Sequence, residues 1–423
     1  MLTVFRTRFS AWLSQDNLLK SRDFRNYWAS GVMAQVGNVV GTLALPLCAV
    51  LILHATPAQM GILTACSAIP FAVFALPAGV WLDRHYKLPI LLASKLVQAA
   101  ALLVIPLAYW MGILSMPWLY ALAALQGTCA IVGGGAEQVL LNLLVGRGNM
   151  VEAQSRFATS DSVVKLTAPG LAGLLIQWLS APIALIINAA GYVFSLLLMR
   201  RVKLEEPAPE PTDKHPLADI ADGFRFIFTQ RLLCVLVTCA GFWHLIYFGY
   251  AAMAVIFATR DLGMTAGQLG AAQILGGLGV MFSAIIMRPL DRNYGPGVTI
   301  LIGTVMSCAV FILMALLPAK LFGSATATFF AYASLTFLFD CGVLLFFVPY
   351  VALRQKVTPD AMMGRMISTT RFLTTAIAPL GALTTGYIAS HSSTRTALAC
   401  VSVGGLALLA GMMMSKQIRS VRS

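Results

Sequence analysis

Charge is what this 423-residue chain has least of. Charged residues make up 11% of it, against about 25% in an ordinary soluble domain, and this excludes a conventional water-soluble protein. Acidic residues are the scarcer sign, with 16 against 29 basic residues. Apolar residues supply 59% of the chain, and the mean hydropathy is +0.82. This balance is typical of a protein that crosses a lipid bilayer many times.

Several chemical motifs are also missing. The eight cysteines include no C-x-x-C pair and all fall in apolar stretches, so we interpret them as small buried hydrophobic residues rather than disulfides or metal ligands. No G-x-x-x-x-G-K-[ST] loop occurs, which excludes the usual cradle for ATP. The first 24 residues lack the compact apolar core of a signal peptide. We therefore expect no enzyme, no metal and no cofactor, with a proton gradient as the energy source.

Long apolar stretches predict twelve transmembrane helices, because each is long enough to cross about 30 Å of hydrocarbon. The predicted spans are 27–53, 57–82, 88–112, 117–144, 156–179, 181–199, 232–258, 266–288, 298–318, 324–352, 364–390 and 394–415. The junctions between the fifth and sixth spans, and between the eleventh and twelfth, are the weakest boundaries. We expect an all-α membrane protein.

A repeat of about 209 residues divides the chain into two halves. Asp-Arg-His-Tyr at 83–86 recurs as Asp-Arg-Asn-Tyr at 291–294, and Thr-Pro-Ala-Gln-Met-Gly at 56–61 recurs as Thr-Ala-Gly-Gln-Leu-Gly at 265–270. A period this long indicates two copies of a six-helix unit rather than a solenoid. The predicted parts are a cytoplasmic tail, a six-helix bundle, a cytoplasmic linker, a second six-helix bundle and a second cytoplasmic tail, at 1–24, 25–200, 201–231, 232–415 and 416–423.

The linker contains a proline-rich stretch, 205–217, which we expect to be extended and solvated. An amphipathic segment follows it at 217–228, with apolar residues on one face and charged residues opposite. This pattern predicts a helix that lies flat on the inner leaflet of the membrane.

Basic residues define the orientation, since they gather on the cytoplasmic side of membrane proteins. With both termini in the cytoplasm, 23 of the 29 lie on that side. Six lie elsewhere, three in outward loops and three within spans: Arg260, Lys320, Arg395, Lys95, Lys165 and Arg371. The opposite orientation would invert this ratio. Topology thus explains the formal charge of +13, and no nucleic-acid partner is needed.

The loop between the second and third predicted spans carries Gly79, Asp83, Arg84 and Lys87. It resembles the G-x-x-x-D-R-x-G-[RK]-[RK] motif of the major facilitator superfamily, as do twelve spans in two six-helix repeats. The resemblance implies two bundles that rock about a central cavity, lined by the first, fourth, seventh and tenth helices.

Three further segments resemble the drug and siderophore exporter branch of that family, which includes macrolide efflux pumps and the enterobactin exporter. They are Phe-Arg-Asn-Tyr-Trp at 24–28, Ala-Asp-Gly-Phe-Arg-Phe at 221–226 and Arg-Gln-Lys-Val-Thr-Pro-Asp at 354–360. The resemblance implies efflux across a bacterial inner membrane.

The motif loop also suggests a gate. The Asp83 carboxylate can accept hydrogen bonds from backbone N–H groups at a helix start. If that start is the eleventh helix near Gly364 and Arg365, the contact would latch the halves together on the cytoplasmic side. Asp291 and Arg292 occupy the matching loop of the second half. The alternative is that these residues only define the orientation.

Polar residues in the four cavity-lining helices predict a central site. They are Gln35, Asn38, Glu137, Gln138, His244 and Asp340, with Trp243 and Tyr247 beside the histidine. An ionised group at the bilayer centre costs roughly 2.5–3.5 kcal/mol, so each one needs a reason. We interpret Asp340 as the proton-carrying group and Glu137 as the second candidate. The alternatives are a hydrogen-bonded structural acid for Asp340, and a structural hydrogen bond for His244.

Three other charges lie within predicted spans. Asp161 and Lys165 are four residues apart and share one face of a helix, so they can neutralise each other. Arg371 lies near the repeat position of Asp161, so an ion pair between the halves is the other hypothesis. Lys95 lies about two turns inside its span, and we interpret it as reaching back to the membrane surface.

Together these features predict a monomeric secondary transporter in a lipid bilayer, with a small-molecule substrate and protons as partners. We expect proton-coupled efflux of an amphipathic molecule, a siderophore or a drug, by alternating access. The alternatives are a proton-coupled importer of a small organic solute, a lipid translocator, a metal exporter that uses His244 and Asp340, and a non-transporting receptor.

Overall fold

The computed structural model describes residues 17–208, 216–359, 362–415 and 417. Within these ranges twelve helices are long and apolar enough to cross a membrane. The first half contains α2 (Asn17–Lys20), α3 (Arg22–Leu47), η1 (Cys48–Ile52), α4 (Pro57–Asp83), α5 (Lys87–Trp110), α6 (Met116–Leu179) and α7 (Ala181–Met199). The second half contains α8 (Pro216–Thr229), α9 (Arg231–Ile256), η2 (Phe257–Asp261), α10 (Ala266–Tyr294), α11 (Pro296–Leu316), α12 (Ala325–Lys356), α13 (Met363–Thr375), α14 (Ala378–His391) and α15 (Thr394–Met414). The prediction of an all-α membrane protein is confirmed.

Most predicted spans coincide with these helices, and the fifth is the clearest exception. It was predicted to begin at 156, but helix is continuous from 148 because α6 joins the fourth and fifth spans. The two spans meet at Gly146, whose φ of 72° is in the region that favours glycine. Both weak junctions are true breaks: α6 and α7 separate at Ser180, and α14 and α15 separate after His391.

The repeat is visible in the backbone. The helices α3 and α9 each continue into a five-residue π-helical turn, η1 and η2, which begin 209 residues apart. The next helix in each half starts with the same reciprocal cap. Thr56 Oγ1 accepts from the Gln59 backbone N–H while the Gln59 side chain accepts from the Thr56 N–H, and Thr265 and Gln268 repeat both bonds.

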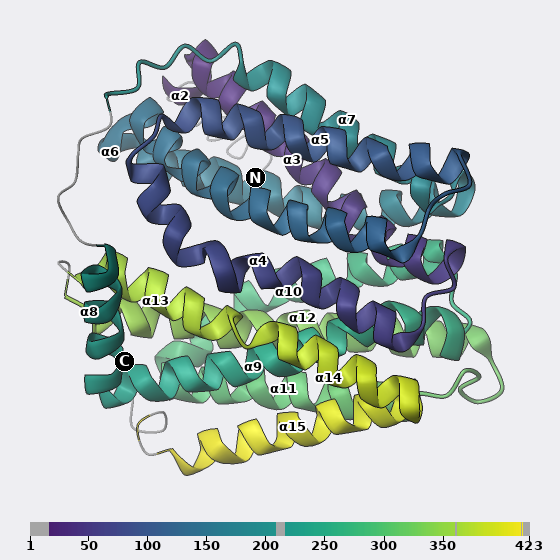
Figure 1. Ribbon diagram of the computed structural model, residues 1–423. Helices are drawn as coiled ribbons and strands as arrows, with labels where there is room; N and C mark the ends of the chain where they lie inside the picture. The colour runs from purple at the N-terminus through teal and green to yellow at the C-terminus, as the bar shows by residue number, and fades with distance from the viewer. Residues whose placement is uncertain (1–16, 209–215, 360–361, 416, 418–423) are drawn as a thin grey trace, which may run out of the picture.

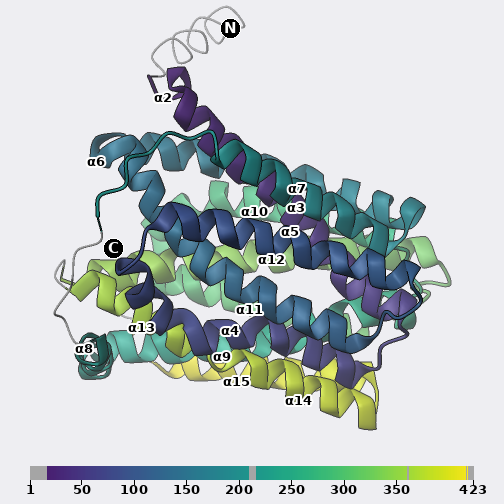
Figure 2. The same cartoon turned by 45° about the horizontal axis from the view of Figure 1, so that its top comes forward.

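The two halves form two helical bundles, one above the other in Figure 1; in the turned view of Figure 2 the two bundles overlap. Small residues let helices pack closely within each bundle, as is common in membranes. Gly37 and Gly41 of α3 lie directly against Asn188 of α7, and Ser30 Oγ lies 2.7 Å from Ser195 Oγ on the same pair of helices. The pairs α3–α7 and α10–α12 are among the most extensively packed in the molecule.

The two ends of the molecule differ. One end carries α2, α8 and the segment that joins the halves (Figure 1), and we call it the linker end. At the opposite, far end the halves meet backbone to backbone. A β-carbon at Gly61 of α4 would lie 2.6 Å from the Ala382 carbonyl oxygen of α14, and one at Gly173 of α6 would lie 2.6 Å from the Ala266 carbonyl oxygen of α10. Glycine at these positions therefore permits a tight closure of the far end.

The linker is less free than expected. The Glu206 side chain is 6% exposed, and its carboxylate accepts from the backbone N–H groups of Lys87 and Leu88 at the start of α5. The prediction of a fully solvated linker is therefore wrong at this residue. Because acidic groups are stabilised at helix N-termini, Glu206 fixes the start of the linker to the first half.

The predicted amphipathic helix is α8, and part of it packs on protein rather than on lipid. Gly223 lies against Thr369 of α13, and Ile227 is fully buried in a cluster with Met366 and Leu233. The helix α8 therefore belongs to the second half.

Candidate functional site

A cavity of about 340 Å³ lies inside the first half, between α3, α5, α6 and α7. Its polar lining residues are Tyr27, Gln35, Asn38, Ser94, Lys95, Gln98, Glu137, Gln138, Gln154, Asp161 and Tyr192. The volume is in the range of small-molecule sites. All of its described lining residues belong to the first half.

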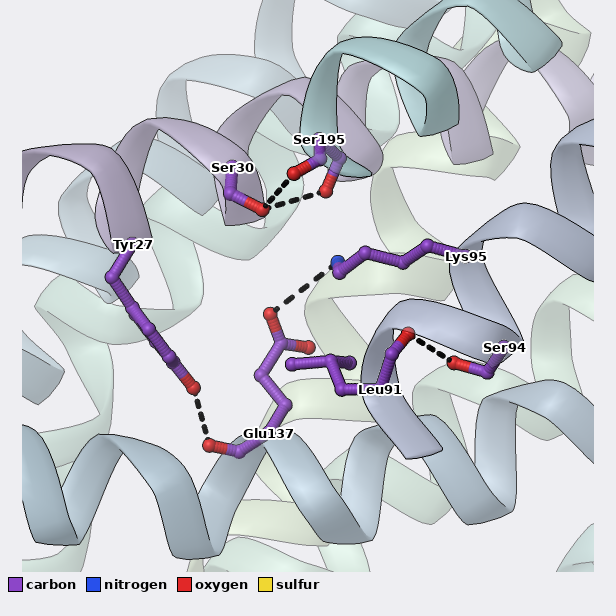
Figure 3. Close-up of polar contacts among 7 residues, drawn as sticks. All are labelled: Tyr27, Ser30, Leu91, Ser94, Lys95, Glu137 and Ser195. Carbon is purple, nitrogen blue, oxygen red and sulfur yellow. Dashed lines mark hydrogen bonds and ion pairs between the residues drawn. The ribbon is translucent and has the colours of Figure 1, made fainter. Parts of the chain in front are cut away.

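An ion pair lies in this cavity. Lys95 Nζ of α5 is 3.9 Å from Glu137 Oε1 of α6, and Figure 3 shows the two side chains pointing toward each other. Lys95 is only 3% exposed, whereas the Glu137 side chain is 34% exposed. Glycine helps to bring the helices together, since a β-carbon at Gly133 would lie 2.5 Å from Ser94 Oγ.

Hydrogen bonds from α3 hold the frame of the cavity. The Tyr27 hydroxyl donates to the backbone carbonyl of Glu137, as Figure 3 shows. Ser30 on the same helix bonds to Ser195 of α7. Both Tyr27 and Ser30 are buried. Tyr27 thus positions the helix that carries Glu137 and leaves its carboxylate to the cavity, while Ser30 holds α3 against α7.

The interpretation of Lys95 as a side chain that reaches the membrane surface is wrong, because it points inward to Glu137. A signal in the sequence could have paired them. Lys95 lies eight residues from the linker end of α5, and Glu137 lies nine residues from Gly146, where its span ends. At 1.5 Å per residue both lie roughly 12–14 Å into the bundle. Two opposite charges at one depth in neighbouring helices are natural partners.

In the second half, aromatic rings occupy the positions equivalent to the cavity. Trp243 of α9 stacks on Tyr247 with ring centroids 5.0 Å apart and meets Phe347 of α12 edge-on at 4.7 Å. His244 Nδ1 is 2.8 Å from the Ala240 carbonyl oxygen on its own helix, to which it can donate. A structural hydrogen bond was the alternative interpretation of His244, and this contact agrees with it.

Asp340 lies apart from the cavity. It is half-buried on α12, where its Oδ2 occupies the space beside Gly276 of α10, and it interacts electrostatically with Lys165 of α6. That all of the predicted residues form one central polar site stays a prediction. Gln35, Asn38, Glu137 and Gln138 come together in the cavity, but Trp243, His244, Tyr247 and Asp340 do not line it.

The predicted charge network is also different. Asp161 lines the cavity, and in the described part of the chain no ion pair joins it to Lys165 or to Arg371. The Arg371 guanidinium instead lies 5.4 Å from the ring centre of Phe71, on a helix of the first half. Arg371 thus reaches the first half through a cation–π contact rather than an ion pair.

The gate residues make separate contacts at the linker end. The Asp83 side chain is outside the described part of the molecule, so its contact with the start of α13 stays a prediction. Lys87 pairs with Glu206 at 3.9 Å, and Arg365 pairs with Asp222 of α8 at 3.1 Å. The other predicted gate residues do not form one contact. Four of them are exposed: Gly79, Arg84, Arg292 and Gly364. Asp291 Oδ1 is buried and has no hydrogen-bond partner among the described residues.

Metal binding finds no support in the described residues, which contain no group of three or more His, Cys, Asp or Glu side chains able to hold an ion. Sulfur and nitrogen ligands normally cluster in such sites. His244 and Asp340 alone do not provide one.

Comparison with known proteins identifies the family. The family model described as Major Facilitator Superfamily matches residues 27–382. The chain belongs to the major facilitator superfamily. As a member of this family it is a multi-pass membrane transporter, which agrees with its twelve apolar helices.

Curated relatives of this superfamily member include siderophore exporters. It is 25% identical over 358 residues to the enterobactin exporter EntS of Shigella flexneri, a match that covers 84% of this chain and 82% of the relative. It is 24% identical over 359 residues to the protein of the same name from Citrobacter koseri, with coverage of 84% and 83%.

Solved structures of transporters share its fold. The nucleoside transporter NupG superposes with a TM-score of 0.75 at 12% identity, covering 93% of this chain and 98% of that one. A bacterial homologue of the iron transporter ferroportin in the inward-facing state gives a TM-score of 0.73 at 15% identity, covering 94% and 99%. These likenesses show the fold alone.

Proposed function

We propose that this protein is a proton-coupled exporter that moves an amphipathic small molecule out of the cell by alternating access. The observation that carries the proposal is the contrast between the two ends. A polar cavity with an ion pair lies in the linker-end part of the first half, while glycine contacts close the far end. This arrangement suits a molecule that opens to one side of the membrane at a time.

The distribution of basic residues supports a cytoplasmic linker end. Arg200, Arg201 and Lys203 follow α7, and Arg354 and Lys356 lie in the last turn of α12 at the same end. Because basic residues favour the cytoplasmic side, we propose that the linker end faces the cytoplasm. The two termini are then cytoplasmic, and the membrane is the inner membrane of a bacterium.

The exporter relatives support the direction of transport, and the residues within the membrane supply candidate proton carriers. Asp340 is a half-buried acid between the halves, and Glu137 is a second acid in the cavity. Moving one charge through 100 mV provides roughly 2.3 kcal/mol. At about 1.4 kcal/mol per tenfold ratio, this supports a substrate gradient of roughly fiftyfold.

The test is transport into inside-out membrane vesicles prepared from a host without its own drug pumps. We expect a panel of fluorescent amphipathic dyes to include at least one that accumulates only when the vesicle interior is acidified, with the accumulation abolished by an uncoupler. Asp340→Asn should abolish accumulation against the gradient while dye exchange without a gradient continues. Unchanged coupling in this variant would reject Asp340 as the proton carrier.

The same assay separates export from import. A proton-coupled importer would accumulate the solute in right-side-out vesicles instead, and a lipid translocator would move a labelled lipid between leaflets. Accumulation of no compound in either orientation would reject the proposed function.

A further inference from the structure

We propose that Lys95 binds an anionic group of the transported molecule, and that Glu137 replaces this group as the partner of Lys95 when the cavity is empty. The inference rests on the proposed transport function and names the substrate class of its cavity. The substrate would be an organic anion that also carries hydroxyl groups.

Lys95 is a buried cation whose ammonium group makes no hydrogen bond to the described residues. Its Nζ lies 3.9 Å from Glu137 Oε1, which is too long for a direct hydrogen bond, since these measure about 2.7–3.2 Å. An ammonium group has three N–H donors, and Glu137 is its ion-pair partner in the described part of the chain. A ligand oxygen that reached hydrogen-bond distance would therefore bind Lys95 more closely than Glu137 does.

The two members of the ion pair are not equally buried. The Lys95 side chain is 4% exposed, so the ammonium is fixed inside the protein. The Glu137 side chain is 34% exposed to the cavity, so its carboxylate can turn into the water there and remain hydrated. The glutamate is thus the member that can give way to a ligand.

The fold itself does not require this lysine. The position 209 residues later is Thr304 on α11, which is fully buried and donates to the Ile300 carbonyl oxygen of its own helix. The equivalent helices α11 and α12 therefore pack together without a charge at either position, since Thr304 and Phe346 stand where Lys95 and Glu137 stand in the first half. Because a buried ammonium is costly, its presence in the first half calls for a functional reason.

The other polar groups around the pair define the rest of the ligand. Tyr27 from α3 donates to the Glu137 carbonyl oxygen, and Tyr192 from α7 lines the cavity with a second hydroxyl. Asp161, on the part of α6 beyond Gly146, contributes a further acid to the lining. A carboxylate accepts hydrogen bonds and repels an anion, so Asp161 favours a hydroxyl donor beside the anionic group that Lys95 holds.

Three small probes of one shape test the charge. Salicylate is an anion with a neighbouring hydroxyl, salicylamide is its neutral analogue, and 2-hydroxybenzylammonium is its cationic analogue. We would measure their binding to the full-length protein in nanodiscs by saturation-transfer NMR at constant pH and ionic strength. We expect salicylate to bind about tenfold more tightly than salicylamide, as one charge-assisted hydrogen bond would give.

Variants of the pair identify the residue responsible. Lys95→Met should weaken salicylate binding at least about tenfold, while Lys95→Arg should retain most of it, because arginine keeps the charge. Glu137→Gln should strengthen binding, because it removes the competing carboxylate. Lys320→Met removes one positive charge from an exposed position outside the cavity, and it should leave binding unchanged.

Two results would overturn the proposal. One is salicylate binding that Lys95→Met leaves intact, and the other is preferred binding of the cationic probe, which would assign the cavity to cations through Asp161 and Glu137. If Lys95→Met does not fold, weaker salicylate binding in Glu137→Gln contradicts the idea on its own. Binding is measured separately from transport. Inside-out vesicles that still accumulate a dye while salicylate fails to bind would therefore refute the substrate class alone.

Discussion

The two halves share a backbone plan but fill equivalent positions with different chemistry. The tight contact of Ser94 with Gly133 in the first half has its counterpart, 209 residues later, in the contact of Gly303 with Gly342. Around this common contact the side chains diverge: Gln35, Asn38, Lys95, Glu137 and Gln138 correspond to His244, Tyr247, Thr304, Phe346 and Phe347. The first set surrounds a polar cavity, and most of the second set joins a cluster of packed rings.

This difference separates what the fold needs from what the site needs. Both halves form the same bundle, so neither the charges nor the rings are required to close it. Aromatic rings fill volume and pack against one another, so the equivalent region of the second half is filled by side chains. Charges in a cavity cost stability and are retained for a purpose. The first half is therefore the candidate for polar recognition.

The strongest test exchanges the chemistry at one equivalent position. Phe346 is 1% exposed and packs on Trp243 and Tyr350. Phe346→Glu should destabilise the protein by about 3 kcal/mol or more, because it buries an unpaired charge. Thermal unfolding in detergent would measure the loss, with Phe346→Leu as the matched control for lost volume. Equal melting temperatures for the two variants would mean that the second half also tolerates charge.

The reverse exchange fills the cavity. Glu137→Phe should lower transport at least about tenfold, because a ring would occupy the space where a ligand must lie. The equivalent position already holds phenylalanine, so the backbone tolerates the ring, but the melting temperature should fall because Lys95 loses its ion-pair partner. Vesicle transport and melting temperature would be measured together, with Gln138→Ala as a control that enlarges the cavity instead. Full transport by Glu137→Phe would show that the substrate does not use this cavity.

A double-mutant cycle measures the ion pair. Lys95→Met alone should cost roughly 1–2 kcal/mol, less than for a fully buried pair because Glu137 is one-third exposed. The double variant Lys95→Met with Glu137→Gln should recover most of this loss, since no unpaired charge remains. Thr304→Val at the equivalent position of the second half is the control. Additive losses in the double variant would argue against any coupling between the two side chains.

The smallest effects should be the same in both halves. Thr56→Ala and Thr265→Ala each remove the side chain that caps α4 or α10, which should cost about 1 kcal/mol apiece. Thr384→Ala, at an exposed position within α14, should cost less than about 0.5 kcal/mol. Melting curves of the three variants would show whether the repeated caps remain equivalent in energy as they are in geometry.

The helices and the repeat could be predicted from sequence because their causes are local. A run of apolar residues defines a span by its own length, and Thr56 and Gln59 cap a helix through bonds only three residues apart. The start of the fifth span was missed because Asn149, Glu152 and Gln154 resemble a loop in composition. In the structure they continue a helix that extends past the apolar stretch.

The site was harder to predict because it depends on contacts between helices. Lys95 and Glu137 are 42 positions apart in the chain, and considering each span separately led to the wrong interpretation of Lys95. The docking of Glu206 onto α5 was missed for the same reason, since a proline-rich stretch carries no sign of the helix end that it meets. Asp340 was recognised as an unusual charge, but sequence could not show that it packs against Gly276 outside the cavity.

The paired π-helical turns η1 and η2 bear on the order of evolutionary events in this molecule. Such turns are rare and arise when a helix accommodates one extra residue. Finding one at the end of both α3 and α9, each followed by the same threonine cap, indicates that a smaller precursor had this turn before it was copied. The divergence of Lys95 from Thr304 came after that copying. The gene thus acquired its scaffold first and its asymmetry second.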